Sequence, residues 1–177
     1  VQKRIESNVK LSDVDFDRSV TRDYSYEKYH YTIYKLSKPL TPGDTLKMKF
    51  RQTFQPRGFE ADNSDTDIVY NGTFFDNAEL PGFGYQKKYE LQDEDDRNDF
   101  ELAQRVQKAG RDDVRELGNA RSGSDSDGTN LEVIISTEAP QTALTSGDLI
   151  TAWSENDRNY FHYKTNQQII HFYPVVS

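Results

Sequence analysis

The stretch YHYTIYKLSKPLTPGDTLKMKF, residues 29–50, carries the strongest indication of the fold class. Residues 29–36 are rich in Tyr and in β-branched side chains, which is typical of a half-buried strand. A Pro-Gly-Asp turn signal follows at 42–44. Residues 46–54 then alternate apolar side chains with Lys and Arg. We predict two strands that pair as an antiparallel hairpin.

Similar strand patterns return near the end of the chain, separated by short polar turns. The predicted strands there are 131–137, 148–155, 159–165 and 167–176. We therefore expect one mainly β domain over residues 1–177, built as an antiparallel sandwich or a curved sheet. The length of the chain is enough for a core of its own.

One helical insertion is expected between these two groups of strands. Apolar residues recur at helical spacing over 98–117, although Gly110 is a weak point. The acidic run at 93–96 is predicted to cap the start of this helix. Residues 118–130 read as a flexible loop. Within that loop, DSDG at 125–128 resembles part of a calcium-binding loop, but too few ligand positions match.

The composition of the chain limits the kinds of partner that it can have. The net charge is −8, which argues against nucleic acid and against an anionic membrane surface as partners. The chain has no cysteine and no apolar run long enough to span a membrane. It starts at Val1 and ends on a predicted strand, so we expect a piece of a longer protein.

No catalytic motif is present. The three histidines, His30, His162 and His171, all lie in aromatic strand patterns, where a structural role is the simpler interpretation. His162 and His171 could approach each other across a hairpin, but a metal site needs a third ligand and no residue marks one. We expect no enzymatic activity and no cofactor in this chain.

The segment NGTFFDNAELPGFGY, residues 71–85, combines turn-forming residues with four large rings. We expect a loop whose rings either complete the domain's own core or contact a neighbouring domain, with its glycines allowing close backbone approach. The specific expectation is that Phe74 or Phe75 is buried and that Phe83 or Tyr85 is exposed.

Two segments resemble one protein family. Residues 29–50 resemble the amino-terminal β-domain of gluzincin aminopeptidases of the aminopeptidase N type. Residues 68–97 resemble a bacterial subgroup, notably from Bacteroidetes, in which an ABC transporter permease is joined to an aminopeptidase-like region. The matching residues of that second segment are Asn71 to Phe75, Pro81, Gly84, Tyr85, Glu90, Leu91, Asp93 and Arg97.

The resemblance implies a non-catalytic β-domain of a membrane-tethered, extracytoplasmic protein. Such a domain would pack against a downstream zinc peptidase domain, absent from this chain, and shape its cleft. Zinc is expected only in that downstream domain, and peptides are candidate partners. No direct membrane contact by this chain is expected. The candidate interdomain contacts are Asn71, Phe74, Phe75, Phe83, Tyr85 and Arg97.

A second function class stays open. Trp153 lies in the predicted strand 148–155, and several strands are rich in Tyr. Aromatic side chains on a strand surface can bind carbohydrate or a partner protein. The alternative function is therefore an independent carbohydrate-binding or adhesive module.

Overall fold

The structure, a computed structural model, describes residues 9–26, 31–55, 68–69, 72–84, 90–105, 112–114 and 128–177. Its strands are β1 (Val9–Phe16), β2 (Val20–Tyr26), β3 (Tyr31–Leu36), β4 (Met48–Phe54), β5 (Ile68–Val69), β6 (Gly72–Phe75), β7 (Glu132–Glu138), β8 (Leu144–Thr145), β9 (Asp148–Glu155), β10 (Arg158–Lys164) and β11 (Val175–Val176). The helices are a 3₁₀ turn, η2 (Asn77–Glu79), and α1 (Glu94–Asp99). All strand pairs are antiparallel, so the mainly β fold class is confirmed.

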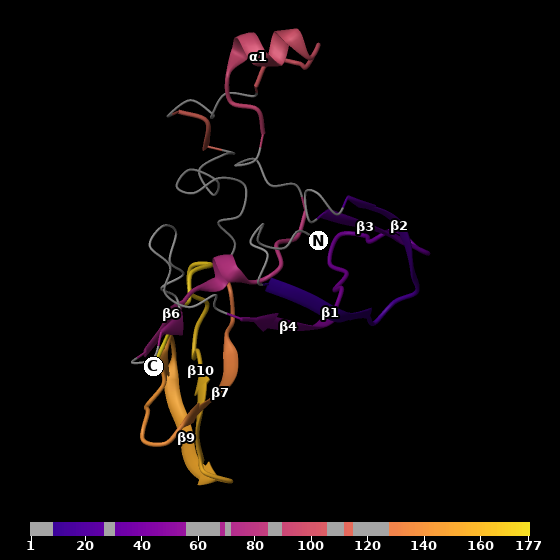
Figure 1. The fold of residues 1–177 in the computed structure, drawn as a ribbon. Coiled ribbons are helices and arrows are strands. Elements are labelled where there is room, and N and C mark those ends of the chain that lie inside the picture. Colours follow the sequence, from indigo (N-terminus) through magenta and orange to yellow (C-terminus); the bar gives the residue numbers. More distant parts are fainter. Residues whose placement is uncertain are drawn as a thin grey trace.

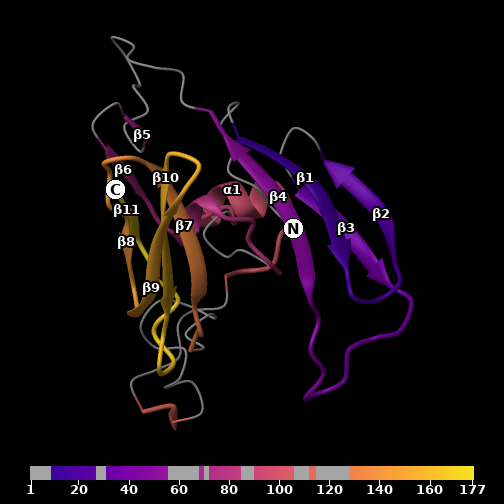
Figure 2. The same ribbon diagram turned by 90° about the horizontal axis from the view of Figure 1, so that it is seen from below.

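The first four strands form two two-stranded sheets that follow each other along the chain, β1–β4 and β2–β3 (Figure 2); together we call them the ribbon. β1 pairs with β4, and β2 pairs with β3 farther along the same ribbon. Two backbone hydrogen bonds bridge the junction, from Asp17 N–H to the Lys47 carbonyl and from Ser37 N–H to the Ser19 carbonyl. β1 and β2 are therefore consecutive parts of one chain segment, and β3 and β4 are the parts of the second segment that pair with it.

This arrangement shows that the predicted hairpin between 29–36 and 46–54 was wrong. Both segments form strands, but each pairs with the chain before it and not with the other. Their connection, residues 37–47, is too long for a tight hairpin loop. The alternating pattern fixes which residues form strands, whereas the partner depends on segments elsewhere in the chain.

The connecting loop is held against the ribbon by polar side chains. Arg18 donates to the Asp44 carboxylate at 3.4 Å and to the Thr45 carbonyl at 3.1 Å. Asp44 also accepts the Thr41 N–H at 3.0 Å, which closes the predicted Pro-Gly-Asp turn. Hydrogen bonds from Thr41, together with the Arg18 charge, hold the pKa of the Asp44 carboxyl below its usual value.

The carboxyl-terminal half contains a three-stranded sheet in the order β7-β10-β9 (Figure 1). β9 and β10 form a hairpin through Asn156 and Asp157, which both have positive φ angles of 49° and 59°. Two successive residues in this conformation make a type I′ turn, which suits the right-handed twist of the strands. β7 then pairs with the other edge of β10.

A second sheet joins the short strands β5 and β6, from the first half of the chain, to β11 and β8 of the carboxyl-terminal half, in the order β5-β6-β11-β8. β6 comes from the segment 71–85 that was expected to be a loop, and β11 is the end of the chain. The predicted strand 167–176 is mostly irregular, with one isolated bridge at Ile169 before the short β11. Pro174 lacks a backbone N–H for a ladder, which explains why the strand begins only after it.

Few apolar side chains of the described residues are buried, and two of them lie on β10 and on the segment between β7 and β8. These two are Tyr163 and Ala143, and the third buried apolar residue is Val9 on β1. The Tyr163 hydroxyl donates to the Ala143 carbonyl at 2.9 Å, so the segment between β7 and β8 is held across β10. Thr137, also buried, donates to the Gln141 carbonyl at 2.8 Å and fixes the same segment.

The helical insertion is shorter and earlier than predicted. α1 ends at Asp99, and the described residues 100–105 and 112–114 are not α-helical. Glu101 has a φ of 53°, and Leu102 N–H bonds the Arg97 carbonyl while Glu101 N–H bonds the Asn98 carbonyl. These are the bonds of a Schellman motif, which ends a helix. The remaining residues of 98–130 lie largely outside the described ranges.

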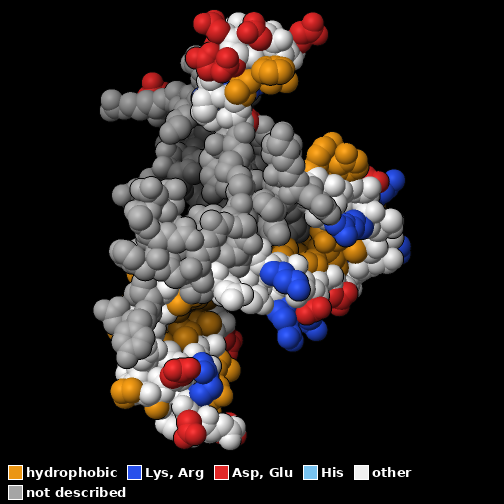
Figure 3. Space-filling view, viewed as in Figure 1, with side chains coloured by type: hydrophobic (Ala, Val, Ile, Leu, Met, Phe, Trp, Pro, Cys, Tyr) orange, Lys and Arg blue, Asp and Glu red, His pale blue; other side chains and the backbone are white. Residues whose placement is uncertain are grey.

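The predicted cap of this helix is confirmed, although the helix that it caps begins at Glu94 and not at residue 98. The Asp93 carboxylate accepts the N–H groups of Asp95 and Asp96 at 2.9 and 3.0 Å. Acidic side chains in the first turn also suit the positive end of the helix dipole. The space-filling view shows them gathered around α1 (Figure 3).

Candidate functional site

The candidate contact residues of the segment 71–85 divide between two environments. Phe74 and Phe75 are neighbours on β6, so their side chains point to opposite faces of the sheet. Phe83 lies beyond η2 and is 55% exposed. Asn71 and Tyr85 lie outside the described residues.

The outer face of the second sheet carries an exposed apolar row. The register places Phe74 opposite Val176, and Val176 opposite Leu144 on β8. These three side chains are 53%, 37% and 58% exposed, respectively. Because directly opposed residues share a face, Phe74, Val176 and Leu144 form one row across three strands. We call this row the outer apolar row.

The inner face of the same sheet borders a cavity of about 770 Å³. Phe75, Val175 and Thr145, which are also opposed in register, line it. Phe75 is half-buried. The expectation that Phe74 or Phe75 is buried was therefore wrong, because the cavity leaves one side of Phe75 open; the expected exposure of Phe83 is confirmed.

A glycine makes this sheet possible. A Cβ built on Gly72 would lie 2.8 Å from the Ser177 carbonyl oxygen. In the same place Thr73 and Ser177 exchange two backbone hydrogen bonds, at 3.0 and 2.9 Å. The close backbone approach expected of the glycines therefore occurs at Gly72, and its neighbour is the end of the described chain itself.

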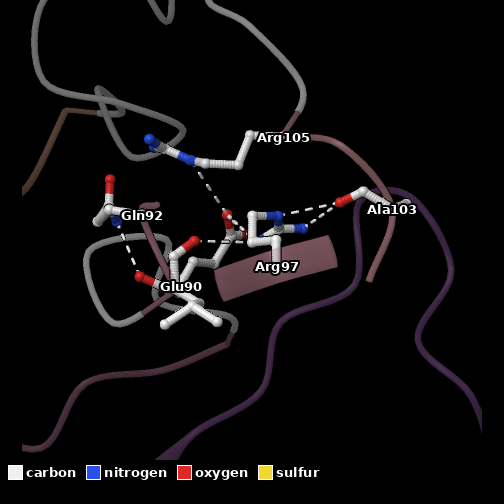
Figure 4. Close-up of polar contacts among 6 residues, drawn as sticks. Glu90, Gln92, Arg97, Ala103 and Arg105 are labelled. Carbon is white, nitrogen blue, oxygen red and sulfur yellow. Dashed lines mark hydrogen bonds and ion pairs between the residues drawn. The ribbon is translucent and has the colours of Figure 1, made fainter. Parts of the chain in front are cut away.

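Arg97 is not part of the outer apolar row; its contacts hold its own segment together (Figure 4). Its side chain is only 12% exposed. The guanidinium donates to the Ala103 carbonyl from Nε at 3.0 Å and from Nη2 at 2.5 Å, and to the Leu91 carbonyl at 3.1 Å. The Glu90 carboxylate lies 3.9 Å from Arg97 and 3.8 Å from Arg105. Arg97 thus ties the two flanks of α1 together.

Two of the three histidines fall within the described residues and lie in separate polar contacts. His162 on β10 is 3.0 Å from the Glu132 carboxylate, which also accepts from Lys164 at 2.9 Å. His171 instead contacts the Thr129 hydroxyl at 3.0 Å. Over the described ranges, no three His, Asp or Glu side chains are grouped so that they could hold a metal ion.

The contacts of Glu132 affect its ionisation. The hydrogen bond from Lys164, and then the one from His162, lower the pKa of the Glu132 carboxyl below its usual value. This carboxylate is exposed and on the sheet surface. It links β7 to β10 through side chains, beside the backbone ladder.

Trp153 packs against Tyr160, its opposite residue on β10. The ring centroids are 5.0 Å apart and the planes are inclined by 7°. The two rings therefore stack on each other, and one face of each is covered by the other. The pair lies on the face of the sheet that also carries His162 and Glu132. Along the ladder, His162 is two positions from Tyr160 and Glu132 is four positions from it.

Three residues with a place in these surfaces were not singled out from the sequence. Leu144 and Val176 complete the outer apolar row, and Arg158 lines the cavity. Val176 and Leu144 lie in very short strands, which alternation cannot detect. Arg158 follows directly after the turn signal Asn156-Asp157, which could have placed it on a hairpin but not beside a cavity.

No family model, no curated protein and no solved structure matches this chain. Among the helices of the described residues, none has the length and apolar composition of a membrane span.

Proposed function

We propose that this chain is a non-catalytic β-domain of a membrane-tethered, aminopeptidase-like protein of the bacterial permease-fusion type. In this proposal the domain packs against a downstream zinc peptidase domain and shapes its cleft, and its sheets are a variant of the aminopeptidase amino-terminal sandwich. The motif resemblance at 29–50 and 68–97 supports the family. The observation that carries the contact role is the outer apolar row.

The outer apolar row suits a domain contact for two reasons. First, Phe74, Val176 and Leu144 come from three strands far apart in sequence, and packing them on one exposed face costs solvation free energy unless something covers them. Second, the row includes Val176, next to Ser177, so a domain that followed would begin beside it (Figure 1). A short connection is thus enough to bring the following domain onto the row.

The family is tested by reading the gene on both sides of this chain. A His-Glu-x-x-His helix after Ser177, and membrane spans before Val1, are expected. An unrelated coding sequence on both sides would contradict the proposal. The extracytoplasmic location is tested in the same protein by protease access from outside intact cells.

The contact role is tested in the longer protein by a Phe74→Ser substitution. We expect faster hydrogen exchange at the amides of β6 and β8 in the longer protein, and unchanged exchange in the chain alone. Phe50→Ser is the matched control, because Phe50 is exposed but lies on the ribbon strand β4. Equal exchange in all three longer proteins would contradict a contact at the row.

The stacked pair Trp153 and Tyr160 favours a second candidate function, that of a carbohydrate-binding or adhesive module. Each ring keeps one outer face, on which a sugar ring could stack. A glycan array with the purified chain tests this function, with Trp153→Ala as the variant. Tyr24→Ala is the control, since Tyr24 also packs on another ring, Tyr26 of β2.

A further inference from the structure

The edge of β7 that is turned away from β10 faces the cavity described above. Residues 131–138 all line it, without interruption. Successive side chains of a strand point to opposite faces, so a cavity that touches each residue in turn must run along the strand's edge. β10 occupies the other edge of β7, and within the described ranges no strand pairs with this one. The opposite wall is the inner face with Phe75, Val175 and Thr145.

The register shows which backbone groups point into this groove. Thr165 N–H bonds the Leu131 carbonyl, and this pair directly precedes Glu132↔Lys164 in the ladder. In an antiparallel pair, hydrogen-bonded residues alternate with residues that point outward. Val133 and Ile135 therefore bond β10. Glu132, Ile134 and Ser136 turn their N–H and carbonyl groups toward the groove.

Arg158 supplies a cation at one end of this edge. Its side chain crosses β7 and donates to the Ser136 hydroxyl at 3.1 Å and to the outward-facing Ser136 carbonyl at 2.9 Å. It is half-buried and lines the groove. Within the described part of the chain it forms no ion pair, although Glu138 lies opposite it in register.

The other charged groups on the groove wall are the carboxylates of Asp76, Glu132 and Glu138, and contacts engage the first two. Asp76 accepts the Ala78 N–H at 2.7 Å, and Glu132 is paired with Lys164 and His162. Arg158 is the cation among the described lining residues that keeps donors for a ligand. A guanidinium with unused N–H groups in a partly buried site favours a carboxylate.

We propose that the β7 groove binds an extended peptide that adds a strand to the β7 edge and places a carboxylate at Arg158. The peptide exchanges backbone hydrogen bonds with Glu132 and Ile134, as in other cases of strand addition. β7 is about 23 Å long, which corresponds to about seven extended residues. The proposal is independent of the interdomain contact, because the groove and the outer apolar row lie on opposite faces of the β6-β11-β8 sheet.

The test uses hexapeptides of alternating Thr and Val, titrated into the purified chain by calorimetry. One has an acetylated amino end and a free terminal carboxylate; a second has an amidated end and one Glu. A third peptide is amidated and has Gln in place of Glu, so it has no carboxylate. The fourth peptide is whichever of the first two binds more tightly, with alternate backbone amides N-methylated. We expect the first or the second to bind, the third at least about tenfold more weakly, and the fourth not at all. The first two also distinguish a terminal from a side-chain carboxylate.

Two pairs of variants locate the site. Ile134→Pro removes an outward N–H but no β7–β10 bond, and should abolish binding; Ile134→Ala keeps that N–H and should bind as the parent does. Arg158→Gln should weaken the carboxylate peptides at least about tenfold. Ser136→Ala, which keeps the guanidinium, should leave them bound. Circular dichroism confirms that each variant is folded.

Several results would overturn the proposal. They are the absence of binding by every peptide at millimolar concentration, binding that survives Ile134→Pro, and an affinity of the peptide without a carboxylate that equals that of the tighter carboxylate peptide. Dimerisation of the chain that Ile134→Pro removes, without peptide binding, would assign the edge to a second copy and would also overturn it.

Discussion

Phe74 on β6 lies directly opposite Val176 on β11, so that two segments far apart in the sequence meet in one sheet. The same register turns their neighbours, Phe75 and Val175, into the cavity on the other face. A single strand pairing therefore creates two different surfaces, the outer apolar row and one wall of the β7 groove. A one-residue slip would exchange the two sets of side chains.

The two phenylalanines of β6 should respond differently to truncation. Phe75→Ala removes a half-buried ring and should lower the free energy of unfolding by about 1–2 kcal/mol, less than the value for a fully buried Phe. Phe74→Ala, at an exposed position, should change it by less than about 0.5 kcal/mol. Urea denaturation of both variants measures the difference. Equal losses would mean that Phe74 is also part of the core.

The strands of the carboxyl-terminal half were predictable because their signals are local. β7, β9 and β10 follow period-two patterns, and the turn at Asn156-Asp157 separates two of them. Partner choice was not local, and so the ribbon strands β3 and β4 were assigned to the wrong partners. The end of α1 was missed because Glu101, and not a glycine, adopts the left-handed conformation that terminates it.

The surfaces were less predictable than the strands. Phe74 could be marked from sequence because a large ring among turn residues is unusual. Leu144 and Val176 acquire a role only through pairing with β6, across long stretches of chain. The Arg158 groove likewise requires knowing that β7 is an edge strand, which no local pattern shows.

Gly72 should not tolerate a side chain. Gly72→Ala places a methyl group 2.8 Å from the Ser177 carbonyl oxygen, which is closer than van der Waals contact allows. We expect the two hydrogen bonds between Thr73 and Ser177 to be lost, with faster amide exchange at both residues and a lower melting temperature. Thr73→Ala, which keeps the backbone contact, is the control. Unchanged exchange in Gly72→Ala would show that the chain end can move away at no cost.

Glu132 should stabilise the folded protein at neutral pH, and this stabilisation should be lost in acid. Its pKa in the folded protein is below its usual value, so its contribution is fully present above the unfolded pKa and is lost as the pH falls through the folded one. An NMR titration of the side-chain carboxyl should give a midpoint below 4.5. Lys164→Met, which removes the nearer cation, should raise that midpoint. A midpoint that Lys164→Met leaves in place would rule out the Lys164 contact as the cause.

The β9–β10 hairpin should be stabilised by a glycine at its second turn position. Asn156 and Asp157 both adopt positive φ, and Asn-Gly is the pair that a type I′ turn favours most. Asp157 is well exposed, so Asp157→Gly should raise the free energy of unfolding by about 0.5 kcal/mol, because the left-handed conformation then carries no Cβ strain. Asp157→Ala, with a Cβ but no side-chain hydrogen bonding, should lower it by a similar amount. Thermal denaturation of the two variants measures both changes, and a loss of stability in Asp157→Gly would mean that the Asp157 side chain stabilises the turn by more than its strain costs.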